Sequence, residues 1–142
     1  LLLRSSIENF IKAVCLKENS NIILEKSVYK IFDLAKASTV FQMSKSGLYD
    51  SIHNQYVELC KDVHTASILN MDHITALNVF PKFDSKKAEQ VCSHFKVLLS
   101  AYVTLLSVVY NDFYHSLYYK NKEIVAASIL TSFKKEINNI EE

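Results

Sequence analysis

The sequence predicts an all-α fold, and three observations carry this prediction. The 142 residues include one glycine and one proline, whereas hairpins and β-sandwiches need turn-forming residues at short intervals. Apolar residues recur with helical periodicity in nearly every segment. Residues 97–111, VLLSAYVTLLSVVYN, carry no charge, and a helix without a charged face is usually enclosed. We therefore expect a compact bundle of five to six helices around a long central apolar helix at about residues 86–119.

The first predicted helix begins at Ser5 or Ser6, because Ser5 and Glu8 have the spacing of a capping box. The apolar residues that follow recur at i, i+3, i+4, i+7 and i+8. They predict one buried face, made of Ile7, Phe10, Ile11, Val14 and Cys15.

Three further helices are predicted before the central one. The second covers about residues 22–41, after the polar turn at residues 19–21. The third covers about residues 48–69, after the only glycine, Gly47. A short fourth helix at residues 73–79 ends before Pro81, because the residue before a proline disfavours the α conformation.

The fifth helix, at about residues 86–119, is the predicted central rod, and a sixth follows at about residues 123–139. Residues placed at 100° intervals give the rod a wide apolar arc, which we expect to face the core. Its members are Val91, Phe95, Leu98, Leu99, Tyr102, Leu105, Leu106, Val109, Phe113 and Leu117.

The bulk properties indicate a single domain at residues 1–142 of an intracellular protein. Sixteen basic and fifteen acidic residues nearly cancel, which disfavours nucleic-acid binding. Three widely spaced cysteines without a CxxC motif are typical of free thiols in a reducing compartment. The uncharged stretch is shorter than the roughly 20 residues that span a bilayer. The chain begins at Leu1 rather than a methionine, so we expect a segment excised from a larger protein.

A stripe of small, uncharged side chains lies opposite the main arc of the fifth helix. Small residues permit close approach of another helix. Either a helix of the same domain covers this stripe, which we favour, or the stripe is a groove or dimer seam for a partner helix. Its members are Val97, Ala101, Thr104, Val108 and Asn111.

Tyrosines crowd the end of the fifth helix and are enriched in binding surfaces. Tyr114 and Tyr118 lie one turn apart, away from the main arc. The favoured interpretation is that these tyrosines pack in the core with a solvent-exposed rim. The alternative is that they form a protein-binding edge. Together with the stripe, this end of the helix gives five expected partner-contact residues: Thr104, Val108, Asn111, Tyr114 and Tyr118.

Metal binding and catalysis have little support in the sequence. His53, Cys60 and His64 share one side of the third helix, and the last two are spaced as metal ligands. A zinc site needs further ligands, so we interpret this side as a semi-buried boundary and predict no metal and no cofactor. The chain has no phosphate loop, no GxSxG and no HExxH motif. We expect no catalytic residues and no small-molecule substrate.

The predicted function is a noncatalytic interaction or assembly domain that binds a partner helix or dimerises through a helix face. Its expected layout resembles that of the Bcl-2 family, in which amphipathic helices surround a central apolar helix, although the NWGR-type signature of that family is absent. The resemblance implies a groove for a partner helix. A nucleic-acid-associated helical domain is the second alternative.

Overall fold

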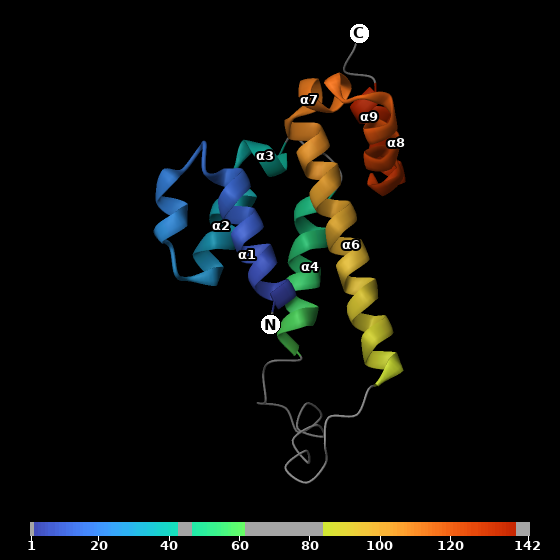
Figure 1. Ribbon diagram of the computed structural model, residues 1–142. Coiled ribbons are helices and arrows are strands. Elements are labelled where there is room, and N and C mark those ends of the chain that lie inside the picture. The colour runs from blue at the N-terminus through green and yellow to red at the C-terminus, as the bar shows by residue number, and fades with distance from the viewer. Residues whose placement is uncertain (1, 43–46, 62–83, 139–142) are drawn as a thin grey trace.

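The computed structural model of this chain describes residues 2–42, 47–61 and 84–138 (Figure 1). The predicted fourth helix at residues 73–79, the end of the third helix and His64 lie outside these ranges. The described residues are helical and contain no strand, which confirms the all-α fold with its long central helix. The elements are α1 (Leu2–Cys15), η1 (Ser20–Leu24), α2 (Val28–Ala37), α3 (Thr39–Gln42), α4 (Leu48–Lys61), α6 (Ser85–Val109), α7 (Asn111–Ser116), α8 (Tyr119–Ser128), η3 (Thr131–Phe133) and α9 (Lys134–Asn138).

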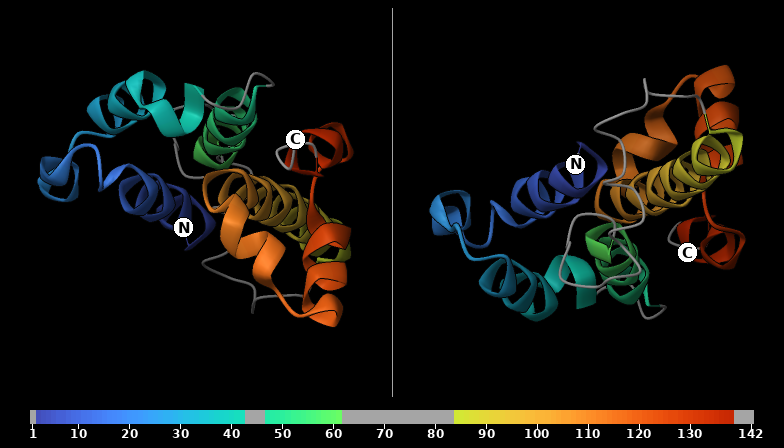
Figure 2. Two further views of the ribbon diagram at one scale, coloured as in Figure 1. Left: turned by 90° about the horizontal axis from the view of Figure 1, so that it is seen from above. Right: turned by 90° about the horizontal axis from the view of Figure 1, so that it is seen from below.

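The long helix α6 lies between an N-terminal group of helices and a C-terminal one (Figure 1, Figure 2). On one side α1 packs against α2 and α4, and α4 packs against α6. On the other side α8 packs against α6, near its C-terminal end. The core face of α1 is close to the prediction, with Ile7, Ile11, Val14 and Cys15 buried. Phe10 is half-buried, and its ring stacks on that of Tyr102 in α6 at 3.9 Å between centroids.

The predicted second helix at residues 22–41 is divided into η1, α2 and α3. The backbone is extended at Glu25, whose carboxylate accepts a hydrogen bond from the Ser27 N–H at 2.8 Å. It is extended again at Ser38, whose buried hydroxyl donates to the Ala35 carbonyl at 3.0 Å. Such side-chain bonds to the backbone compete with helical hydrogen bonding, so the apolar period continues while the helix does not.

The predicted fifth helix at residues 86–119 ends earlier than expected, because the backbone leaves the helical conformation at Tyr110 (φ −115°, ψ 50°). Neither glycine nor proline causes this break. Instead α7 is attached to α9: the Asn111 amide and the His115 ring both lie 3.0 Å from the Ile137 carbonyl oxygen. These long-range contacts stabilise a turn that local sequence does not signal.

The inner face of α6 differs from the predicted apolar arc. Leu98 and Leu105 are buried as expected. Ala101, Thr104 and Val108, from the small-residue stripe, are buried with them. Five members of the predicted arc are exposed instead: Val91, Phe95, Leu99, Leu106 and Phe113. At Thr104 the turn after α8 comes close enough for the Leu130 N–H to donate to the hydroxyl.

Among the described helices, α6 alone is long and apolar enough to cross a membrane, by length and composition. The charge-free stretch at residues 97–111 is too short to span a bilayer by itself, but α6 begins earlier, at Ser85. The core helix of a soluble protein can pass the same test. In α6, 33% of the 18-residue segment that meets the hydropathy criterion is buried inside the domain.

Candidate functional site

The exposed side of α6 presents three large apolar side chains at one-turn spacing. Val91, Phe95 and Leu99 are 53%, 52% and 44% exposed. At 3.6 residues per turn they lie within a quarter-turn of one another, so they form one continuous strip along the helix. We call these three residues the open face of α6. Most apolar side chains of this size in a small domain are buried, so the open face is a candidate contact surface.

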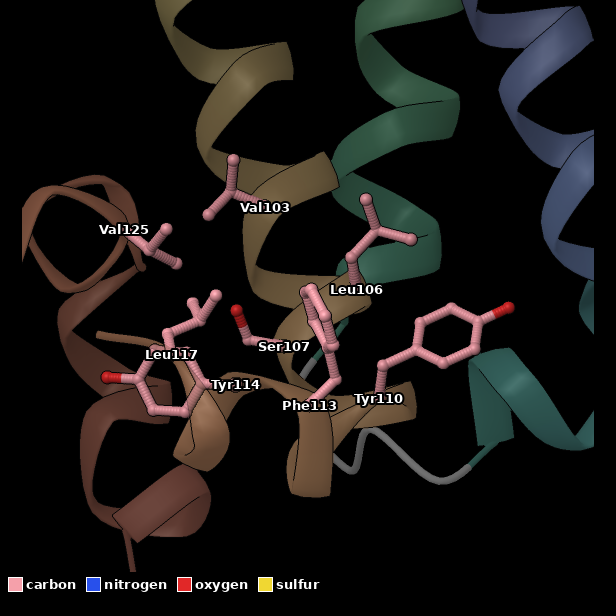
Figure 3. A pocket seen from close by; sticks show the side chains of 8 residues that line it. All are labelled: Val103, Leu106, Ser107, Tyr110, Phe113, Tyr114, Leu117 and Val125. Carbon is pink, nitrogen blue, oxygen red and sulfur yellow. The ribbon is translucent and has the colours of Figure 1, made fainter. Parts of the chain in front are cut away.

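A second feature, which we call the junction pocket, is a cavity of about 360 Å³ where α6, α7 and α8 meet (Figure 3). It exists because the chain turns at Tyr110 and again after α7, so side chains from three helices line one partly open space. Nearly all of its surface is apolar. The lining side chains are Val103, Leu106, Ser107, Tyr110, Phe113, Tyr114, Leu117 and Val125.

Two lysines accompany the tyrosine rings that line the junction pocket. The Lys17 ammonium, at the end of α1, lies 5.4 Å from the centre of the Tyr110 ring. The Lys122 ammonium, in α8, lies 5.2 Å from the centre of the Tyr114 ring and 3.0 Å from His115 Nδ1. Such distances are those of cation–π contacts. They bring positive charge beside an otherwise apolar cavity.

A third hollow, between α2 and α4, has a volume of about 520 Å³ and mixed chemistry. Phe32 forms its base and makes edge contacts with the rings of Tyr49, His53 and Tyr56. Burial is the main cause that raises the pKa of Tyr56, and the hydrogen bond that its hydroxyl donates to a Glu8 carboxylate oxygen at 2.9 Å raises it further. Burial also raises the pKa of Tyr49, so the hydroxyls of Tyr49 and Tyr56 stay neutral and act as structural donors.

The five expected partner-contact residues occupy different environments. Thr104 and Val108 are buried in the domain. The Thr104 hydroxyl donates to the Ser100 carbonyl at 2.7 Å and accepts the Leu130 N–H at 3.0 Å. Neither side chain is presented to a partner in this arrangement, which agrees with the favoured interpretation that the domain itself covers the stripe.

The other three expected contact residues lie near the junction pocket. Asn111 is half-buried and anchors α9 through the Ile137 carbonyl. Tyr114 is buried and lines the pocket. Tyr118 is 62% exposed, and its ring centroid lies 4.5 Å from that of Tyr119. The crowding of tyrosines was therefore the signal for this pocket. Lys122 lies close to these tyrosines in the sequence, whereas Lys17 was missed because it follows the distant α1.

The side of α4 that carries His53 and Cys60 borders the mixed hollow, and both residues are half-buried. Within the described ranges, no three metal-ligating side chains come together. Comparison of the chain with protein-family models, with curated proteins and with solved structures finds no match.

Proposed function

We propose that this domain is a noncatalytic interaction module that recognises a partner helix, or a second copy of itself, through the open face of α6. The observation that carries the proposal is the exposure of Val91, Phe95 and Leu99 on one strip of a 25-residue helix. Side chains at i, i+4 and i+8 match the spacing with which helices present apolar anchors to one another.

Burial of this surface would supply part of the free energy that recognition needs. Full burial of a side chain of this kind contributes about 1.5–3 kcal/mol. Each of the three is about half exposed, so covering each would contribute roughly 1 kcal/mol. Phe95 stands in the middle of the strip, where aromatic side chains most often dominate binding energy. Polar neighbours such as Lys96 would then lie at the rim and set orientation.

The open face is not the small-residue stripe that supplied expected contact residues in the sequence analysis, although most of that stripe also lies on α6. Ala101, Thr104 and Val108 of the stripe are buried inside the domain, whereas Val97 is exposed. The open face remains outside, and its backbone is held in a helix of 25 residues whose N-terminus is capped by Asp84. A helix already formed costs less conformational entropy on binding than a segment that folds on contact.

The test compares wild type with Leu99→Glu and the matched control Leu24→Glu, whose parent residue is 77% exposed in η1. Light scattering measures self-association, and affinity capture followed by mass spectrometry measures partner binding. We expect a dimer or a captured partner that survives Leu24→Glu and is lost with Leu99→Glu, while circular dichroism shows both variants folded. If wild type is monomeric and captures only what Leu99→Glu captures, the proposal is wrong.

A further inference from the structure

The junction pocket has the shape and chemistry of a small-ligand site rather than of a packing defect. Its volume of about 360 Å³ lies at the lower end of the roughly 300–1,000 Å³ range of small-molecule pockets. The walls are aliphatic and aromatic side chains from three helices. Figure 3 shows the Ser107 hydroxyl pointing into the space between Leu117 and Phe113, while the hydroxyls of Tyr110 and Tyr114 point away from it.

Both charged side chains that lie over the tyrosine rings of the pocket are positive. Lys17 lies over the Tyr110 ring and Lys122 over the Tyr114 ring, and these two rings stand on opposite sides of the cavity (Figure 3). No carboxylate of the described ranges lies within 4.0 Å of either ammonium. An ammonium has three donors, and Lys122 directs one of them at His115 Nδ1. Donors on both lysines therefore remain for an anionic ligand.

We propose that the junction pocket binds a single-chain amphiphile with a carboxylate head, such as a medium-chain fatty acid. The apolar cavity takes the chain, because its walls offer little to a polar ligand. The head lies near Lys122, whose ammonium beside the Tyr114 ring supplies a charge-assisted hydrogen bond. A cationic head would be repelled by the same lysines, and the small volume favours one chain over the two of a membrane lipid. This inference does not depend on the open face, which lies further along α6.

The binding test uses isothermal titration calorimetry with decanoate, decanol and decyltrimethylammonium, each below its micelle concentration. We expect decanoate to bind at least tenfold more tightly than decanol, and the ammonium amphiphile not to bind. Octanoate should bind roughly fifteenfold more weakly than decanoate, because each buried methylene contributes about a fourfold gain. Equal binding of decanoate and decanol, or no binding by either, would overturn the proposal.

Two variants and one control locate the site. Lys122→Gln should remove most of the preference for decanoate over decanol, whereas Lys120→Gln, which alters a lysine beside Tyr119 outside the pocket, should leave it unchanged. Val125→Phe should narrow the cavity and weaken binding of both ligands without loss of helicity. Unchanged binding in both Lys122→Gln and Val125→Phe would place the ligand elsewhere and overturn the assignment. Binding to phosphatidylglycerol vesicles in place of decanoate would also contradict it.

Discussion

The two faces of α6 show that hydrophobicity alone does not decide which face of this helix enters the core. The inner face includes the small side chains of Ala101, Thr104 and Val108, all buried. The outer face carries larger apolar groups, Phe95 and Leu99, each about half exposed. Small residues allow the turn after α8 to approach closely enough for the Leu130 N–H to bond Thr104. Bulkier residues would hold that segment away.

The strongest contrast between the faces is expected from a matched pair of glutamate substitutions. Val108→Glu places a carboxylate in the core without a partner, which should cost roughly 3–5 kcal/mol and unfold much of the domain. Val91→Glu makes the same change on the open face and should alter the free energy of unfolding by less than about 0.5 kcal/mol. Urea unfolding followed by circular dichroism measures both. A folded Val108→Glu variant would restore the stripe as a candidate interface.

Truncation of leucines should separate the faces in the same direction. Leu105 is fully buried, so Leu105→Ala should cost about 2–5 kcal/mol. Leu99→Ala should cost less than Leu105→Ala, about 1 kcal/mol, because nearly half of the Leu99 side chain is already in water. The predicted apolar arc would assign the larger cost to Phe113→Ala as well, but Phe113 is 68% exposed, so we now expect a small effect. Similar losses in all three variants, measured by chemical denaturation, would contradict the assignment of the faces.

The hydrogen bond at Thr104 should contribute a smaller amount. Thr104→Val keeps the shape and leaves the Leu130 N–H without its acceptor, which should cost about 1–3 kcal/mol. Thr104→Ser retains the hydroxyl and should recover part of this loss. Thermal melts of the two variants, compared at equal concentration, provide the measurement. If the Thr104→Val variant is as stable as wild type, the close approach of the Leu130 segment to α6 depends on packing alone.

The smallest expected effect concerns Glu18, which caps α3 from the end of α1. Its carboxylate accepts hydrogen bonds from the Thr39 hydroxyl and from the N–H groups of Thr39 and Val40, and these bonds lower its pKa, the hydroxyl most of all. Because the folded pKa lies below the ordinary value of 4.5, the stabilisation is present above about pH 4.5 and is lost as the pH falls through the folded pKa. The melting temperatures of wild type and Glu18→Gln should therefore converge towards pH 3. A constant difference from pH 7 to pH 3 would show that this cap does not titrate.

The fold class and the core face of α1 could be predicted because they follow from local periodicity and composition. The inner face of α6 could not, since a helical wheel ranks faces by apolar area and contains no information about which neighbour approaches. The break at Tyr110 was missed for a related reason. It is stabilised by Asn111 and His115 contacting the carbonyl of Ile137, more than twenty residues away.

The candidate site was predictable in part. The crowded tyrosines at the end of the predicted rod pointed to the region where the junction pocket forms. The positive charge beside it comes from Lys17, in the turn after α1, and from Lys122 in α8. No spacing rule connects residues so far apart, so only the tertiary structure shows that they flank the same cavity.

Thiol labelling would test most directly whether α6 has one enclosed face and one open face. Cys92 is exposed on the open side, and Ala101 is buried on the inner side. We would label native wild type and Ala101→Cys in a Cys92→Ser background, and follow each cysteine by peptide mass spectrometry. We expect Cys92 to react as fast as a thiol in an unfolded peptide, and the cysteine at position 101 to react only as fast as the domain opens. Equal rates at the two positions would contradict the division of this helix into an inner and an open face.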